Sequence, residues 1–309
     1  MEKLALDSDI ITLIKGKKIV IGLSGGADSV SLLYLLKDLA EIHAIHVNHM
    51  IRGNEAERDM IFCKNLCKNL NVRFQSYFVD IPKLCSESGN SLETEARNRR
   101  IELFSNYCLK NNIQYVALGH HMNDQAETIL FNICRGSHGA CGMKKIQRMK
   151  NYTILRPLLG VKKSDILSFM KDNNHEWVED CTNQKNDVSR NIIRNIVIPS
   201  LNEAVKRDVV PTICRCGNIQ QRTDRAISEA FSLLPILDPQ GRLFCPFLKD
   251  KSKDFVISVI SWYFDKNDIY YTESKLQEAY QVFIGEKNII NLKNNIKFKR
   301  KEKRCFLVY

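Results

Sequence analysis

Short apolar strands alternate with longer helices up to Pro199, and this alternation restricts the fold more than any other feature of the sequence. The first strand is a β-branched run at 18–23, which ends in the turn 24–26 and gives way to apolar residues at helical spacing. Because parallel neighbouring strands need helical crossovers, the pattern predicts an α/β fold with a mostly parallel, doubly wound, Rossmann-like sheet. The other strands are expected at 42–47, 72–79 and 114–118, and the helices at 30–36, 55–71, 91–112, 124–135, 163–173 and 189–205.

The alternation fades beyond Pro199, where a smaller α+β domain is expected. Helical patterns at 201–234 lead into a stretch that carries Pro and Gly, and the last residues predict a hairpin with Asn294 and Asn295 at its turn. We therefore predict two domains, 1–204 and 205–309. The glycine-bearing, basic segment 136–150 has no clear periodicity and is expected to be a mobile loop.

Charge and cysteine content narrow the class of protein. The chain has 46 Lys and Arg against 35 Asp and Glu, and a net charge of +11 favours a polyanionic partner, nucleic acid first and an anionic membrane surface second. The 11 cysteines are odd in number and include no CxxC pair, which indicates reduced thiols in a cytoplasmic protein. No signal peptide and no run of roughly 18 apolar residues is found, so neither secretion nor a membrane span is expected.

The segment after the first strand has the chemistry of a phosphate site. Two glycines allow a sharp turn, and the free N–H groups at the start of the next helix favour an anion. Asp28 could hold a divalent cation on the phosphates. A plain glycine turn with a capping Ser or Asp is the simpler alternative. The candidate phosphate-binding residues are Ser24, Gly25, Gly26, Ala27, Asp28 and Ser29.

This segment, SGGADS, resembles the SGGxDS loop of the PP-loop ATP pyrophosphatases, which cleave ATP between its α and β phosphates. The resemblance implies a PP-loop catalytic domain at 1–204 that uses ATP and Mg²⁺. It also implies that the loop holds the departing pyrophosphate, with Asp28 as metal ligand and catalytic residue.

Four further segments resemble the tRNA(Ile)-lysidine synthetases in particular. They are HVNHMIRG at 46–53, EARNRR at 95–100, GHHMNDQAET at 119–128 and WVEDCTNQKNDVSRNIIR at 177–194. The resemblance implies ATP-dependent ligation of free L-lysine to C2 of the wobble cytidine in an isoleucine tRNA with a CAU anticodon. The product would be lysidine, formed through an adenylated base, and decoding would change from AUG to AUA.

Two carboxylates in the GHHMNDQAET segment are candidates for amine binding. Asp124 and Glu127 are three residues apart and share a helix face, where they suit an ammonium group or a metal, or merely complement the helix dipole. The resemblance implies that they hold the ε-amine or α-amine of lysine. It also implies an acid–base or orienting role for His120 or His121, and we take His120 as the catalytic candidate.

Arginines and histidines complete the predicted site. Guanidinium groups match two oxygens at once, so they suit the α phosphate, the lysine carboxylate or the RNA backbone. Arg99 is expected to be solvated, and Trp177 and the turn 180–183 are given no catalytic role. The predicted nucleotide-binding residues are Arg97, Arg100, His46, His49 and Arg52, and the predicted catalytic arginines are Arg190 and Arg194.

The predicted C-terminal domain, 205–309, is expected to bind the tRNA. Basic residues crowd the last hairpin, with Phe298 and Phe306 between them, although such a run is also typical of a solvated surface. One C-terminal module is expected, and the oligomeric state is left open, with a homodimer as one option. The basic residues are Lys297, Lys299, Arg300, Lys301, Lys303 and Arg304.

The sequence departs from the family pattern in two places. The glycine loop, RGSHGACGM at 135–143, is two residues shorter than usual and lacks the usual following proline. Ile101 replaces an aromatic residue, which predicts looser packing there. Three alternatives also stay open: a tRNA cytidine thiolase, which would need the missing CxxC cysteines; a small-molecule synthetase; and a basic RNA-binding protein with an idle nucleotide loop.

Overall fold

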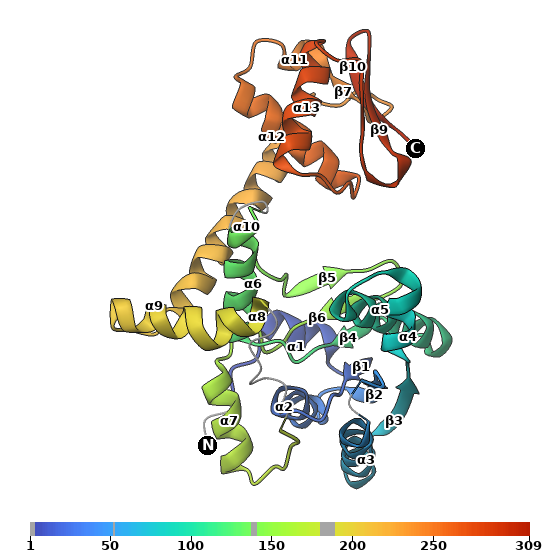
Figure 1. The fold of residues 1–309 in the computed structure, drawn as a ribbon, viewed down its shortest axis with the longest axis vertical. Helices are drawn as coiled ribbons and strands as arrows, with labels where there is room; N and C mark the ends of the chain where they lie inside the picture. The colour runs from blue at the N-terminus through green and yellow to red at the C-terminus, as the bar shows by residue number, and fades with distance from the viewer. Residues whose placement is uncertain (1–3, 52, 137–140, 180–188) are drawn as a thin grey trace. The chain divides into compact units, whose positions relative to one another are not determined.

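The computed structural model of the chain describes residues 4–51, 53–136, 141–179 and 189–309. It divides into two compact units, Met1–Gly217 and Asn218–Tyr309, which are coloured blue to yellow-orange and orange to red in Figure 1. The division falls inside helix α10 (Val210–Leu233), further along the chain than residue 204. The reason is that the first turns of α10 bury Val210 and Cys214 in one apolar cluster with Ala126 of helix α6 (Met122–Cys134).

The first unit is built on a six-stranded sheet in the order β3-β2-β1-β4-β6-β5. All neighbours pair in parallel except β5 and β6, so the predicted α/β fold with a mostly parallel sheet is confirmed. The order reverses direction at β1, and ligands of such sheets bind outside the carboxyl ends of strands at that reversal. The strands are β1 (Lys18–Gly22), β2 (Glu41–Asn48), β3 (Arg73–Phe78), β4 (Tyr115–Ala117), β5 (Ile146–Arg148) and β6 (Thr153–Leu155).

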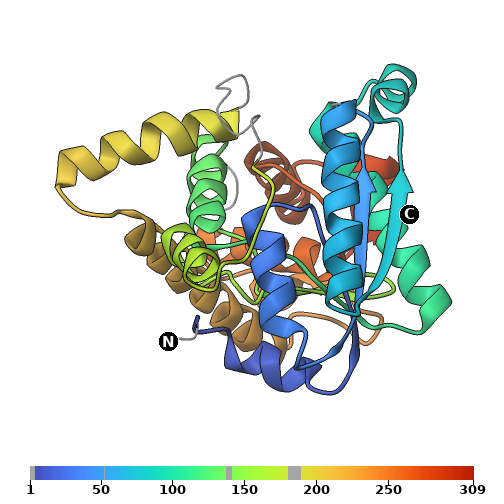
Figure 2. The same ribbon diagram turned by 90° about the horizontal axis from the view of Figure 1, so that it is seen from below.

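Helices cover both faces of this sheet. Ile19 and Ile21 of β1 pack into one apolar cluster, while Val20 packs into another on the opposite face, as the two-residue period of a strand requires. The first cluster joins α1, α2, α3 and α7, and the second joins α5 through Phe104. Figure 2 shows α2 and α3 running alongside the strands. The helices are α1 (Ser8–Ile14), α2 (Ala27–Leu36), α3 (Asn54–Asn69), α4 (Ile81–Ser88), α5 (Leu92–Asn111), α7 (Lys163–Asp172), α8 (Ser189–Ile192) and α9 (Ile198–Val205).

Four elements of the first unit were not predicted from the sequence: α1, α4, β5 and β6. Helix α4 was not expected, and it begins at Ile81 after Asp80, whose side chain caps it by accepting from the N–H of Lys83. The prediction of a loop at 136–150 is wrong for β5, which pairs with β6 as an antiparallel edge strand. Residues 137–140 of that segment lie outside the described residues. A strand of three residues is too short to show a periodicity in the sequence.

The second unit packs two helices against a four-stranded antiparallel sheet in the order β7-β10-β9-β8. The predicted hairpin is confirmed: β8 and β9 pair, and Asn294 and Asn295 form the turn with φ of 59° and 60°. Phe298 is fully buried in the core, so its predicted place beside the basic residues at the surface is wrong. The elements are β7 (Leu243–Phe244), α11 (Cys245–Leu248), α12 (Lys253–Lys266), α13 (Glu273–Ile284), β8 (Ile289–Asn291), β9 (Lys297–Lys301) and β10 (Arg304–Val308).

None of the helices in the described part of the chain combines the length and the apolar character that a bilayer crossing demands.

Candidate active site

The SGGADS segment links the end of β1 to the start of α2. Hydrogen bonds join the first and last residues of this segment. The Oγ atoms of Ser24 and Ser29 are 3.0 Å apart, and Ser29 Oγ also accepts from the N–H of Ser24. Gly25 has φ +97°, in the left-handed region that favours glycine. Gly26 in the capping position of α2 has no side chain that could bond the first N–H groups of the helix, an arrangement that suits the predicted phosphate site.

Gly119, which follows β4, lies directly against this segment. A Cβ atom at Gly119 would come within 2.9 Å of the carbonyl carbon and oxygen of Asp28, so only glycine fits there. The carboxyl ends of β1 and β4 therefore meet, and they bring the SGGADS and GHHMNDQAET segments into backbone contact. The strand order of the sheet reverses at β1, so this contact lies at the reversal.

Asp28 lies on the first turn of α2 between two partners. Lys163 Nζ lies 2.6 Å from Asp28 Oδ1, and His121 Nε2 lies 3.7 Å from Asp28 Oδ2. The aspartate side chain is 30% exposed, so its carboxylate remains open to solvent. Lys163 was not predicted as a site residue, because it lies in no motif recognised in the sequence.

His121 and Asp124 cap helix α6 reciprocally. The N–H of His121 donates to Asp124 Oδ2, while His121 Nδ1 accepts from the N–H of Asp124. Because Nδ1 accepts this hydrogen bond, Nε2 is the ring nitrogen that carries a proton, and it lies 3.5 Å from Asp124 Oδ2 and 3.7 Å from Asp28 Oδ2. One imidazole therefore stands between the carboxylates of the two motifs.

Glu127 and Asp124 share a single guanidinium group. Arg194 Nε lies 2.6 Å from Glu127 Oε1, Nη2 lies 2.9 Å from Oε2, and Nη2 also reaches Asp124 Oδ1 at 3.2 Å. Burial raises the pKa of Glu127, and the hydrogen bonds from Arg194 oppose that rise. The structure thus brings together Asp124, Glu127 and Arg194, three of the predicted catalytic residues.

Arg190 does not join that group. Its guanidinium lies 3.3 Å from Glu93 and over the ring of Phe131. A π-helical turn, η2 (Ile193–Val197), begins between Arg190 and Arg194. Such turns frequently occur at functional sites.

A second group of cations surrounds His120. Burial and the charge of Arg97 lower the pKa of Arg100, and burial together with both of these arginines lowers the pKa of Arg156 to about 10. Burial also lowers the pKa of His120 to about 4, so its imidazole is neutral at pH 7. Arg156 was not predicted as a site residue, and it is held by the carbonyl of Lys144. This cluster of like charges is suited to an anion.

The predicted nucleotide-pocket histidines have different surroundings. His46 is buried and its Nδ1 donates to the carbonyl of Leu23, so it holds the residue that directly precedes the SGGADS segment. His49 is half-buried at the end of β2, and Arg52 lies outside the described residues. The N–H of Val178, beside Trp177, donates to the carbonyl of Gly25, a backbone contact that side-chain motifs could not reveal.

The side chains at the phosphate loop fit a Mg²⁺ ion that is bound together with a nucleotide. Among the described residues, no three His, Cys, Asp or Glu side chains gather into a metal cage. Mg²⁺ in nucleotide enzymes is usually held by one or two carboxylates together with phosphates and water. The partly exposed carboxylate of Asp28, next to the uncapped helix start, offers that arrangement.

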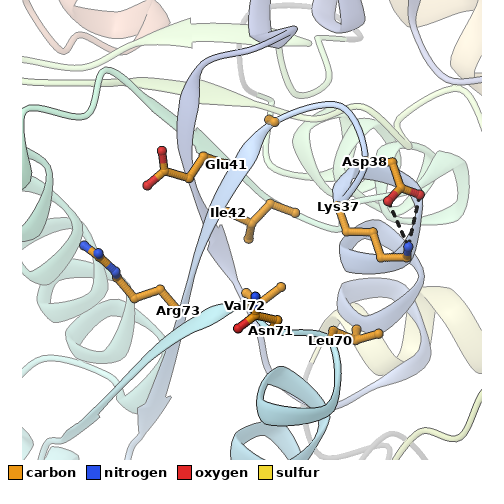
Figure 3. A pocket seen from close by; sticks show the side chains of 9 residues that line it. Lys37, Asp38, Glu41, Ile42, Leu70, Asn71, Val72 and Arg73 are labelled. Carbon is orange, nitrogen blue, oxygen red and sulfur yellow. Dashed lines mark hydrogen bonds and ion pairs between the residues drawn. The ribbon is translucent and has the colours of Figure 1, made fainter.

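A separate hollow of about 340 Å³ lies at the opposite edge of the sheet. It is bordered by the starts of β2 and β3, and Figure 3 shows Glu41 and Arg73 at its rim and the ion pair of Lys37 with Asp38. Its lining contains none of the residues of the predicted motifs.

Comparison with known proteins identifies the family of this chain. The model of the PP-loop domain family matches residues 3–201. A curated tRNA(Ile)-lysidine synthase from Chlorobaculum tepidum is 32% identical over 235 residues, which cover 73% of this chain and 70% of that protein. The chain belongs to the PP-loop family of tRNA(Ile)-lysidine synthases.

Other members of the family extend beyond the matched part. The tRNA(Ile)-lysidine synthase of Clostridioides difficile is 39% identical over 211 residues, which cover 66% of this chain but 45% of that protein. The chain thus spans less than half of the length of that relative. Among solved structures, a U34-tRNA thiolase from Methanococcus maripaludis superposes with a TM-score of 0.56 at 18% identity and covers 71% of this chain and 75% of its own. At that identity the likeness shows the fold alone.

Proposed function

We propose that the chain ligates free L-lysine to C2 of the wobble cytidine of an isoleucine tRNA with a CAU anticodon, in the cytoplasm and at the expense of ATP. One observation supports this most strongly. The imidazole of His121 lies 3.7 Å from Asp28 in the phosphate loop and 3.5 Å from Asp124 in the acidic group. In this proposal a single side chain separates the nucleotide site from the amine site, as a reaction between adenylated base and lysine requires.

The first step activates the base. The C2 oxygen of the cytidine attacks the α phosphorus of ATP, the bond from that phosphorus to the bridging oxygen breaks, and pyrophosphate leaves onto the SGGADS loop. The N–H groups at the start of α2 and the hydroxyls of Ser24 and Ser29 bind it. Mg²⁺ held by Asp28 would supply additional positive charge to the phosphates.

Arginine side chains stabilise the charge on the α phosphate in this proposal. Arg97 and Arg100 lie together on α5, and Arg156 lies close enough for their charge to lower the pKa of its own guanidinium. An anion that entered this cluster would relieve the repulsion between the three cations. Neutral His120 beside them is able to orient the cytidine or the phosphate through a hydrogen bond.

The second step joins lysine to the base. Asp124 and Glu127 receive the ammonium group of lysine, which takes over the contacts now made by Arg194. Glu127 accepts the proton, because burial raises its pKa toward that of an effective base. The freed amine attacks C2, the bond from C2 to oxygen breaks, and AMP leaves with that oxygen.

The outer face of the second unit's sheet is the proposed tRNA surface. Strand pairing sets Lys299 opposite Phe306 and Lys301 opposite Arg304, on the face away from buried Phe298. Lys299 Nζ lies 6.0 Å from the centre of the Phe306 ring. Lysines bind the phosphate backbone, and an aromatic ring beside them is able to stack on an unpaired base.

Incubation with ATP, labelled lysine and tRNA transcripts tests the proposal. We expect labelled lysidine, identified after nuclease digestion, only with the CAU isoleucine transcript and not with the methionine transcript. A thiolated nucleoside formed with a sulfur donor would instead favour the thiolase alternative. ATP–pyrophosphate exchange without RNA would favour a small-molecule synthetase.

A further inference from the structure

Lys163 connects the phosphate loop to the acidic helix. Its ammonium lies 2.6 Å from Asp28 Oδ1, and its own backbone N–H donates to Asn123 Oδ1 at 3.1 Å. Asn123 is on α6, directly before Asp124, so one residue is bonded to α2 at its tip and to α6 at its backbone. The N–H of Met122 also donates to the carbonyl of Val161 and joins the starts of α6 and α7 a second time.

These contacts hold the backbone of Lys163 in place. It is the first residue of α7, and Asn123 supplies the N-terminal cap that Lys162, in the capping position, does not provide. The stem of Lys163 thus starts from a fixed point and ends on Asp28. Both side chains are about one-third exposed, so the pair lies at the mouth of the site.

We infer that Lys163 is a positioning residue of the nucleotide site, which orients the carboxylate of Asp28 for the metal–pyrophosphate group and couples it to the amine-binding helix. The inference rests on the proposed function only in taking Asp28 as the metal-binding residue. Lys163 balances the charge of Asp28 and keeps its second oxygen toward His121. Lys163 therefore acts through Asp28 and makes no contact with the nucleotide.

The adjacent Lys162 provides a matched control. It makes the same kind of ion pair, 2.6 Å from Asp208, with a similarly exposed side chain. Asp208 lies in none of the motifs, so Lys162→Met removes an equivalent charge and ion pair without reaching the phosphate loop. Any effect confined to Lys163 therefore reports on Asp28.

Binding of a non-hydrolysable ATP analogue, measured by calorimetry over a range of Mg²⁺ concentrations, tests this without requiring turnover. Lys163→Met should weaken Mg²⁺-dependent binding about tenfold, as expected when a charge-assisted hydrogen bond is removed. Lys163→Arg should restore most of it, and Lys162→Met should match the wild type. Binding by Lys163→Met within about twofold of wild type, or an equal loss in Lys162→Met, would overturn the inference.

A double-mutant cycle with Asp28→Asn identifies the route of the effect. If Lys163 acts through Asp28, then Lys163→Met should cause no further loss in the Asp28→Asn background. A further loss of the same size would show that Lys163 contacts the nucleotide directly and would overturn the positioning role. Thermal melts establish that each variant folds, and Lys163→Gln replaces Lys163→Met in the cycle if the latter does not. Because the experiment measures nucleotide binding, it tests the role of Lys163 even if the chain makes no lysidine.

Discussion

Arg194 binds Glu127 in a bidentate manner through one edge of its guanidinium group, with Nε 2.6 Å from Oε1 and Nη2 2.9 Å from Oε2. Glu127 is buried, and a buried carboxylate without a cation is unfavourable. Arg194 thus occupies the position proposed for the ammonium group of lysine. The acidic group keeps a cationic partner at each stage of the proposed reaction.

Glu127→Gln tests the amine site. The amide has the same shape but no charge, so we expect the KM for lysine to rise about tenfold or more, while the KM for ATP stays near that of the wild type. Steady-state kinetics with lysine and ATP varied in turn measure both. Glu102→Gln is the control, since Glu102 is an exposed carboxylate paired with Arg99, to which no role in the site is assigned. An unchanged KM for lysine in Glu127→Gln would contradict the assignment.

Gly119→Ala tests the contact between the two motifs. The added methyl group would lie 2.9 Å from the carbonyl of Asp28, and relief of that clash should displace the loop, destabilise the unit by about 1–3 kcal/mol and weaken ATP binding. Gly160→Ala serves as the control because a Cβ there meets no atom within 4 Å. Denaturant titration and ATP-analogue binding are the measurements. Equal behaviour of the two variants would show that the contact is not required.

Sequence motifs named more of the residues in the candidate site than of the contacts that hold those residues in place. The loop at 24–29 and the pair Asp124 and Glu127 were found because their chemistry lies in contiguous motifs. Lys163 and Arg156 were missed, since each reaches the site only through tertiary packing of a segment that has no motif of its own. Hydrogen bonds from backbone atoms, such as Val178 to Gly25, leave no side-chain pattern at all.

The secondary structure was likewise predicted only where the sequence carries a local pattern. Longer elements such as α5 and β2 were predicted to within a few residues, because their apolar periodicity extends over several turns or pleats. The edge strand β5 was missed, since its three residues are specified by pairing with β6. Phe298 was expected beside the basic side chains of its strand, but strand register turns it into the core.

The acid stability of the second unit should depend on Asp238. Burial opposes its charge, but hydrogen bonds from Arg242 and Arg304 outweigh that effect and lower its pKa to about 2. An ordinary aspartate has a pKa of about 3.9, so the stabilisation is complete above that pH and is lost as the pH falls toward 2. The wild type should therefore be more stable than Asp238→Asn at neutral pH, and this difference should shrink between about pH 4 and pH 2.

Urea titration followed by fluorescence measures this difference. Trp262 lies in the second unit, and substitution of Trp177 by Phe leaves it as the single tryptophan. Asp250→Asn, at an exposed aspartate in the same unit, provides the control. A difference between wild type and Asp238→Asn that stays constant down to pH 2 would contradict the role of the two arginines.

The outer sheet face should govern tRNA affinity. Replacement of Lys297, Lys299 and Lys301 by Ala should weaken tRNA binding and flatten its salt dependence, by about 0.7–0.9 in the log–log slope for each phosphate that the variant no longer neutralises. ATP binding should not change. Filter binding over a range of salt concentrations measures this slope.

A second triple variant separates local contacts from net charge. Lys249, Lys251 and Lys253 are exposed lysines of the same unit outside the sheet, and their replacement by Ala removes the same charge. If both triple variants bind tRNA equally weakly, the sheet face is not the tRNA surface.

The most direct test of the central claim follows the α phosphorus of ATP. With α-labelled ATP, Mg²⁺ and the CAU isoleucine transcript but no lysine, the label should become attached to the tRNA, and pyrophosphate should be released. Addition of lysine should then release the label as AMP and leave lysidine in the tRNA. Label that never reaches the tRNA, or ATP cleaved to ADP and phosphate, would contradict the account.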